Sequence, residues 1–131
     1  MKTLIVEDDV ASGLVLHGLL ARYGECHIAV NGREGVKAVR MALLTGKPYD
    51  LICLDIMMPE MDGQTALKEI RNSERELESS GRNRAKIVMT TAVADKNTVL
   101  KAIQEHCDGY LVKPIEKVKL LEELHRLNLL R

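Results

Sequence analysis

The stretch LICLDIMMPEMDG, residues 51–63, carries the pattern on which the fold prediction rests. Residues 51–54 are all apolar, which is typical of a strand buried on both faces of a parallel sheet. Asp55 follows at the carboxyl end of this strand, and Pro59 and Gly63 mark an irregular turn after it. An ionised carboxylate at the end of a buried strand is costly unless a cation or a hydrogen-bond donor pairs with it. We therefore expect a partner for Asp55 from another part of the chain.

The composition is typical of one globular domain. The 131 residues are 46% hydrophobic and 29% charged, which argues against disorder. The 19 basic side chains balance the 19 acidic ones, so the net charge predicts binding neither to nucleic acid nor to a membrane. No apolar run approaches the roughly 18 residues of a membrane span, and the first residues turn acidic too early for a signal peptide. We expect a cytoplasmic protein whose three cysteines are free thiols rather than zinc ligands or disulfides.

Short apolar runs alternate with longer amphipathic segments along the chain. The predicted strands are 3–7, 27–30, 50–55, 86–91 and 109–112, and the predicted helices are 10–23, 32–45, 63–78, 95–107 and 116–127. This strict alternation predicts an α/β fold, a doubly wound parallel sheet with helices on both faces and right-handed crossovers. In such sheets the functional site lies beyond the carboxyl ends of the strands.

Apolar residues at helical spacing predict which face of a helix is buried. These residues are Leu14, Val15, Leu19 and Leu20 in the first helix, Leu67, Ile70 and Leu77 in the third, and Val118, Leu121, Leu124 and Leu127 in the last. Asn31 and Glu34 form a predicted capping pair for the second helix. The charge-rich segment 71–84 is predicted to be a solvated helix extension and loop, with a partner-specific surface as the alternative.

Polar side chains gather where the predicted strands end. Glu7, Asp8 and Asp9 follow the first strand, Asp55 the third, Thr91 the fourth and Lys113 the fifth. Carboxylates at one edge of a sheet repel one another, and a hard divalent cation with oxygen ligands relieves that repulsion. A lysine adds a point charge suited to phosphate. The chemistry that fits is attack by a carboxylate on phosphorus, with Asp55 as the nucleophile because it is single, central and held by a strand.

Each of these residues also has an ordinary structural explanation when it is taken alone. Asp9 can cap the helix that begins near Val10, Thr91 can be a plain strand residue, and Lys113 can be a surface charge. Tyr110 can be a half-buried aromatic of its strand. The coincidence of polar residues at the ends of several strands of one sheet favours a shared site.

Four motifs of the chain are similar to those of the receiver domains of two-component response regulators, including the stand-alone chemotaxis-type regulators. They are LIVEDD at 4–9, LDIMMPEMDG at 54–63, TTA at 90–92 and GYLVKP at 109–114. The resemblance covers the whole chain and implies one receiver domain over residues 1–131, with no residues left for an output domain. It also implies the flavodoxin-like strand order 2-1-3-4-5.

Carried over to this sequence, the resemblance assigns roles to single residues. It implies that Asp55 accepts a phosphoryl group and that Asp8 and Asp55 bind magnesium directly, with manganese as a possible substitute. Glu7 would bind the metal through water, and the backbone carbonyl of Met57 would complete the protein ligands. Lys113 would be the lysine that contacts the phosphoryl group. Thr91 would be the switch hydroxyl and Tyr110 the switch aromatic. A cis bond before Pro114 is implied as well. The chain departs from the family pattern at Ile115, where an aromatic is usual, and at Met57, which is polar in many relatives.

The resemblance further implies a signalling protein and not an enzyme, apart from catalysis of its own phosphorylation and dephosphorylation. Its partners would be a histidine kinase and a downstream protein that reads the surface formed by residues 95–127. Two other functions stay open: a pseudo-receiver that binds partners without phosphorylation, and a flavodoxin-like enzyme or nucleotide-binding module. The second is disfavoured because no G-x-G-x-x-G or Walker A loop follows the first strand.

Overall fold

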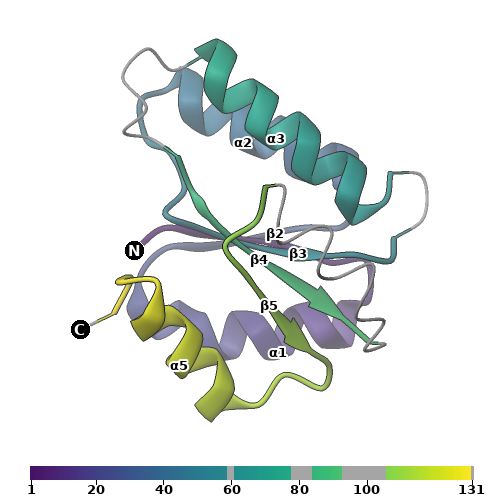
Figure 1. The fold of residues 1–131 in the computed structure, drawn as a ribbon, viewed down its shortest axis with the longest axis vertical. Coiled ribbons are helices and arrows are strands. Elements are labelled where there is room, and N and C mark those ends of the chain that lie inside the picture. The colour runs from purple at the N-terminus through teal and green to yellow at the C-terminus, as the bar shows by residue number, and fades with distance from the viewer. Residues whose placement is uncertain (59–60, 78–83, 93–105, 131) are drawn as a thin grey trace.

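The sheet has the strand order that the resemblance implies. A computed structural model describes residues 1–58, 61–77, 84–92 and 106–130 (Figure 1). Its strands are β1 (Thr3–Val6), β2 (Cys26–Ala29), β3 (Leu51–Asp55), β4 (Lys86–Thr91) and β5 (Gly109–Val112). They form one sheet in the order β2-β1-β3-β4-β5, and each neighbouring pair is parallel. The predicted fold class is confirmed.

Helices cover both faces of the sheet. They are α1 (Val10–Leu20), α2 (Gly32–Leu44), α3 (Gly63–Leu77) and α5 (Lys117–Arg126), with a short 3₁₀ turn, η1 (Ala21–Tyr23), after α1. α2 and α3 lie on one face of the sheet, and α1 and α5 lie on the other (Figure 1). Most of the predicted helix at 95–107 falls outside the described residues. Within the described ranges, no helix is long and apolar enough to cross a membrane.

Side chains just before α1 and α2 satisfy backbone N–H groups that a helix leaves unpaired at its amino end. The carboxylate of Asp9 accepts a hydrogen bond from the N–H of Ser12 at 3.1 Å, and the Asn31 side chain accepts one from the N–H of Glu34 at 2.8 Å. Asn31 is therefore the cap, as predicted. Asp9 follows the end of β1 by three residues and Asn31 follows the end of β2 by two. The first turns of α1 and α2 therefore lie near the carboxyl edge of the sheet.

Apolar side chains fill two layers, one on each side of the sheet. Towards α2 and α3 the strands contribute Leu4, Val6, Ile52, Leu54, Ile87 and Met89. Towards α1 and α5 they contribute Ile5, Leu51, Cys53, Val88 and Leu111. Successive strand residues point to opposite faces, so a strand that is covered on both faces must be apolar at every position. This is why β3 reads as an unbroken apolar run that ends at Asp55.

The predicted buried face of α1 is partly wrong. Leu14 is 60% exposed and Val15 53%, whereas Gly13, Leu16 and Leu20 are buried against the sheet. Apolar residues occupy most positions around this helix, so their spacing does not single out one face. Packing decides it instead, because the helix buries the side that carries the small residue Gly13.

The predicted buried face of α5 needs one correction. Val118 is 66% exposed, and Leu120 is buried in its place. Leu124 and Leu127 are buried as predicted, and Leu121 packs partly buried against the same core. The buried positions are therefore spaced by four and three residues, which keeps them on one side of the helix.

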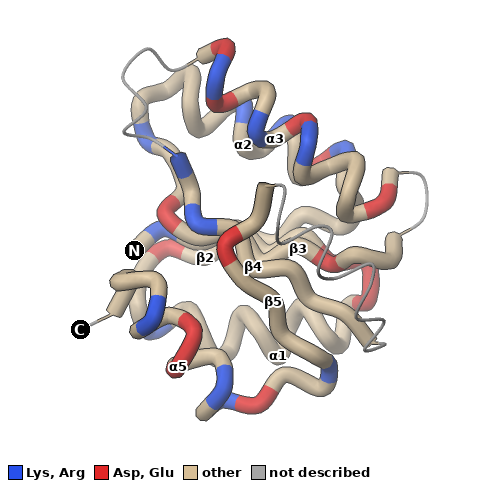
Figure 2. Tube along the Cα trace, viewed as in Figure 1, with Lys and Arg blue, Asp and Glu red and all other residues tan. Residues whose placement is uncertain are grey.

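Acidic and basic residues are interspersed along α3 (Figure 2). Leu67 and Ile70 are buried and Leu77 is partly buried, as predicted. The expectation of a solvated segment at 71–84 is wrong for Arg71, Ser73 and Glu74, which are all buried. Its loop part, 78–83, lies outside the described residues. Charged residue types alone therefore misled the prediction here, because these side chains find buried partners.

The cysteines are free thiols, as predicted. Cys53 and Cys107 are buried, and Cys26 is half-buried. Burial raises the pKa of Cys53 to about 12 and that of Cys107 to about 11. Both thiols therefore stay protonated at neutral pH and act as small apolar groups of the core.

Candidate functional site

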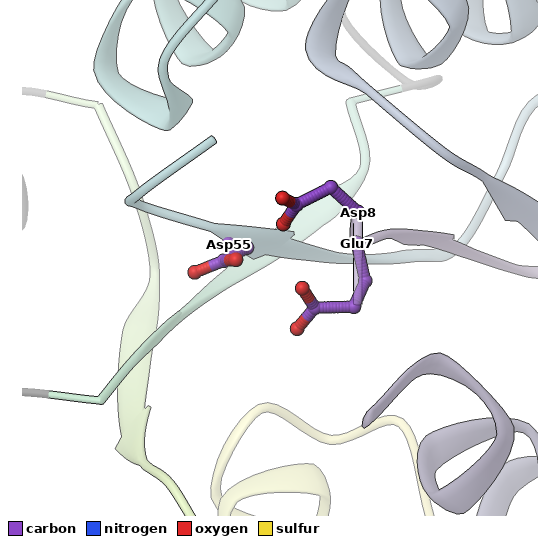
Figure 3. A group of neighbouring side chains, drawn as sticks. All are labelled: Glu7, Asp8 and Asp55. Carbon is purple, nitrogen blue, oxygen red and sulfur yellow. The ribbon is translucent and has the colours of Figure 1, made fainter. Parts of the chain in front are cut away.

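Three carboxylates meet at the carboxyl edge of the sheet. Glu7 and Asp8 follow β1, and Asp55 ends the neighbouring strand β3. One carboxylate oxygen from each of the three lies within 4.8 Å of the other two. Figure 3 shows Glu7 and Asp8 on opposite sides of the strand end, both with their carboxylates turned towards Asp55. The convergence predicted from the sequence is confirmed for these residues.

The chain turns back sharply beyond Asp55, which is 3% exposed. The N–H of Gly63 donates to the carbonyl of Ile56 at 2.9 Å, and the N–H of Met57 donates to Oδ1 of Asp55 at 3.3 Å. A Cβ atom at position 63 would lie 2.2 Å from the carbonyl oxygen of Asp55. Glycine is therefore required where α3 begins, because any side chain would push the helix away from the carboxylate site.

Lys113 supplies the positive charge of the site. Its ammonium group forms an ion pair with Glu7 and lies 3.3 Å from Oδ2 of Asp55. The lysine follows β5, where its N–H donates to the carbonyl of Thr91 at 2.7 Å, and its bond to Pro114 is cis as expected. The sequence did not indicate that the ammonium also contacts Glu7. Nothing in the spacing of residues along the chain shows which of two neighbouring carboxylates a lysine reaches.

The electrostatics of the site follow from burial and crowding. Burial raises the pKa of the Glu7 carboxyl, and the neighbouring Asp55 adds to the effect although Lys113 opposes it. Burial alone would lower the pKa of Lys113, but its contacts with Glu7 and Asp55 outweigh that and the pKa is raised. Two buried carboxylates thus share one ammonium, and the exposed Asp8 adds a third negative group. Such a set of oxygen donors is suited to a hard divalent cation that enters from the Asp8 side.

The side chains of Asp9 and Met57 lie outside the cluster of three carboxylates. Asp9 caps α1, and its hydrogen bonds from Ser12 lower the pKa of its carboxyl. Its backbone N–H donates to Oε2 of Glu7 at 3.2 Å, so Asp9 supports the site through its main chain. The side chain of Met57 is 73% exposed at the rim of the site.

The predicted switch residues lie on the two adjacent strands β4 and β5. Thr91 is buried at the carboxyl end of β4, where it pairs with Val112. Tyr110 is 43% exposed on β5, which agrees with a strand aromatic directed outward. Tyr110 pairs with Met89, so Thr91 and Tyr110 lie diagonally across the β4–β5 pair.

Comparisons with known proteins agree with this geometry. The chain matches the model of the response regulator receiver domain over residues 3–125. It is 30% identical over 125 residues to the chemotaxis protein CheY of Bacillus subtilis, which covers 95% of each chain. It is 38% identical over 129 residues to hybrid signal transduction histidine kinase G of Dictyostelium discoideum, which is 96% of this chain but 4% of the kinase.

A solved structure shows the same fold. The receiver domain of the histidine kinase CKI1 from Arabidopsis thaliana, complexed with Mg²⁺ and BeF₃⁻, matches with a TM-score of 0.79 and 26% identity over 95% of this chain and 89% of that one. Receiver domains are signalling modules of two-component systems and in general are not enzymes. The family model spans almost the whole chain, and the acidic cluster lies at the edge of the sheet where the fold places a site. The chain belongs to the response regulator receiver family.

Proposed function

We propose that residues 1–131 act as a single phosphoacceptor receiver, which takes a phosphoryl group from a histidine kinase onto Asp55. The observation that carries the proposal is the convergence of Glu7, Asp8 and Asp55 within 4.8 Å of one another beside the Lys113 ammonium. Asp55 is the acceptor because the rigid end of β3 holds its carboxylate between the other charged groups. Its Oδ2 lies 3.3 Å from Lys113.

In the proposed step, a carboxylate oxygen of Asp55 forms a bond to phosphorus while the bond from phosphorus to the donor nitrogen breaks. The electron pair of the broken bond stays on the kinase histidine, which gains a proton from solvent. Lys113 balances the negative charge on the oxygens of the transferred group. Hydrolysis of the acyl phosphate by water reverses the state, so the chain catalyses only its own modification and its removal.

The residues present fit a magnesium ion. Asp8 and Asp55 would bind it directly with the backbone carbonyl of Met57, and Glu7 would act through water because its carboxylate already contacts Lys113. A bound divalent cation supplies further positive charge to the phosphoryl oxygens. The magnesium found in the related CKI1 receiver supports this assignment, and manganese prefers the same oxygen ligands.

The phosphorylated state would be read on the side of the sheet formed by residues 95–127, of which the structure describes 106–127. Thr91 would donate its hydroxyl to a phosphoryl oxygen, and Tyr110 would turn inward to fill the space that this movement opens. A hollow of about 460 Å³ on this side is lined by Tyr110, Val112, Lys119 and Glu122 among others. A downstream protein that contacts this hollow would sense the position of Tyr110.

The test is labelling with acetyl phosphate and magnesium, followed by intact-mass and peptide mass spectrometry. The wild type should gain one phosphoryl group, and Asp55→Asn should gain none. Asp62→Asn is the matched control, because Asp62 caps α3 by accepting from the N–H of Thr65 at 2.8 Å and asparagine caps equally well. Equal labelling of Asp55→Asn would refute the acceptor assignment, and no labelling of the wild type would indicate a pseudo-receiver.

A further inference from the structure

Two arginines from opposite faces of the sheet hold the amino end of β5. From α3, Nε of Arg71 donates to the carbonyl of His106 at 2.9 Å, and Nη2 donates to Oδ2 of Asp108 at 2.9 Å. From α5, on the other face, Nη2 of Arg126 donates to the carbonyl of Asp108 at 2.6 Å. The residues directly before β5 are therefore bound from both sides.

Asp108 also fixes how β5 pairs with β4. Its N–H donates to the carbonyl of Ile87 at 2.8 Å, and its Oδ2 accepts from the N–H of Ile87 at 2.8 Å. The ladder then begins with Val88 opposite Gly109. β5 has four residues and lies at the edge of the sheet, so few other bonds hold its register. A shift by one residue would turn every side chain of the strand to the opposite face.

The same guanidinium holds the start of β4. Nη1 of Arg71 donates to Oε1 of Glu74 at 2.7 Å and to the carbonyl of Ala85 at 2.8 Å, while Oε2 of Glu74 accepts from the N–H of Ala85 at 2.7 Å. Arg71 is 5% exposed and Glu74 is 6% exposed, so water competes little for these bonds. One planar group with donors in fixed directions thus sets β4 and β5 relative to α3.

We propose that Arg71 is a positioning residue for the phosphorylation site, acting through Asp108 and β5 on Lys113. Lys113 directly follows β5, and its ammonium must reach both Glu7 and Asp55. α3 begins against Asp55, with Gly63 packed on its carbonyl oxygen, and eight residues later it binds the start of β5. The helix therefore links the acceptor carboxylate to the strand that carries the lysine. This role rests on the proposed function of Lys113.

A purely structural role for Arg71 makes a different prediction. If the ion pairs of Arg71 only stabilise the fold, their loss lowers the fraction of folded molecules and leaves each folded site unchanged. If Arg71 positions Lys113, the folded molecules themselves are altered at the site. The useful measurements are therefore made per folded molecule, at a low temperature where circular dichroism shows that the variant is folded.

The experiment compares Arg71→Met with Arg71→Lys and with Arg75→Met, an exposed arginine one turn further along α3. We expect acetyl phosphate to label Arg71→Met at least about tenfold more slowly per folded molecule, because a small displacement of a charge-stabilising group has effects of this size. NMR signals of residues 109–113, the Lys113 side chain included, should shift. Arg71→Lys should be intermediate, since it keeps the charge and loses the planar fork. Arg75→Met should match the wild type.

Wild-type labelling per folded molecule, together with unshifted signals of 109–113 in Arg71→Met, would overturn the proposal. If Arg71→Met does not fold, Asp108→Asn decides by the same two measurements, because it keeps the size of the side chain and removes the charge that faces Arg71. If the wild type is not labelled at all, the proposed phosphoacceptor function fails, and the signals of 109–113 still decide whether Arg71 positions Lys113.

Discussion

Two groups of charged side chains lie at opposite edges of the same sheet and are built differently. The site cluster at the carboxyl edge consists of Glu7, Asp8, Asp55 and Lys113. The arginine cluster at the amino edge consists of Arg71, Glu74 and Asp108. In the arginine cluster the carboxylates bind different nitrogens of one guanidinium, and each also accepts a backbone N–H at 2.7 or 2.8 Å. In the site cluster the carboxylates face one another, and the backbone N–H groups that reach Glu7 and Asp55 lie at 3.2 and 3.3 Å.

The difference shows how the fold separates stability from function. Carboxylates that bind separate nitrogens of an arginine and also accept backbone N–H groups have hydrogen-bond partners for their charge, and they connect the strands to a helix. Carboxylates that converge without enough donors repel one another and retain free oxygen atoms for an added cation. Burial raises the pKa of Glu7, and the neighbouring carboxylate of Asp55 adds to this effect. A cluster of the first kind should be costly to break, whereas one of the second kind should gain stability when its negative charge is reduced.

The largest effect is expected from Arg71→Met. The substitution leaves the buried carboxylate of Glu74 and the half-buried carboxylate of Asp108 without their cation, and removing one partner from a buried ion pair typically costs about 3–5 kcal/mol. Urea unfolding followed by circular dichroism should show this loss in the free energy of unfolding. Arg75→Met should stay within about 0.5 kcal/mol of the wild type, as is usual for exposed positions. A loss below about 1 kcal/mol in Arg71→Met would contradict the view that the arginine cluster stabilises the fold strongly.

Magnesium should have the next largest effect, and only through the site cluster. A ligand that binds the folded state alone adds about 2.7 kcal/mol to the free energy of unfolding at a concentration 100 times its dissociation constant. The wild type should show this gain, and Asp8→Asn should lose most of it because a direct ligand is removed. Glu74→Gln should keep the full gain although it is less stable overall. An equal gain in the wild type and in Asp8→Asn would refute the ligand role of Asp8.

The same substitution in the two clusters should have opposite signs. Glu74→Gln removes a charged hydrogen-bond partner of Arg71 and should cost about 1–3 kcal/mol. Glu7→Gln removes a crowded charge and, without metal, should raise the free energy of unfolding by about 0.5–2 kcal/mol near neutral pH. The measurement is urea unfolding of both variants in the presence of a chelator.

The pH dependence of the Glu7→Gln effect follows from the raised pKa of Glu7. In the unfolded chain this carboxyl ionises near its ordinary value of 4.5, and in the folded protein it ionises at a higher pH. Ionisation therefore costs the folded state stability as the pH rises from 4.5 through the raised pKa. The gain of the glutamine variant should be present near neutral pH and should vanish below that window. A gain that is independent of pH would point to packing instead of charge.

Much of the fold could be predicted because β3, between Leu51 and Asp55, is apolar on both faces and ends in a charge. A strand buried on both sides requires crossover helices, and parallel strands bring their carboxyl ends to one edge. The convergence of Glu7 and Asp55 follows from that topology. The buried side of α1 could not be predicted, because Leu14 and Leu16 are equally apolar and contacts with the sheet decide which is covered.

The arginine cluster was missed for a physical reason. Arg71 and Glu74 are three residues apart in a charge-rich stretch, a pattern that is far more often a solvated helix face. Their burial depends on backbone groups of Ala85 and His106, which are close in space only in the folded chain. The site cluster has a signal in the sequence because a strand end positions each member. The arginine cluster has no such signal, since it also depends on main-chain atoms of Ala85 and His106, whose residue types do not reveal these contacts.

The smallest effect is expected from Arg126→Met, on the opposite face from Arg71. Arg126 bonds the carbonyl of Asp108 and pairs with Glu123, but its side chain is 53% exposed. Solvent screens such a pair, so the free energy of unfolding should fall by about 0.5 kcal/mol, and the fall should shrink in high salt. The loss from Arg71→Met, which breaks bonds shielded from water, should depend little on salt. Urea unfolding of both variants at low and high salt therefore distinguishes the contribution of Arg71 from that of Arg126 to holding the start of β5. A loss in Arg126→Met as large as that in Arg71→Met would show that exposure does not set their strength.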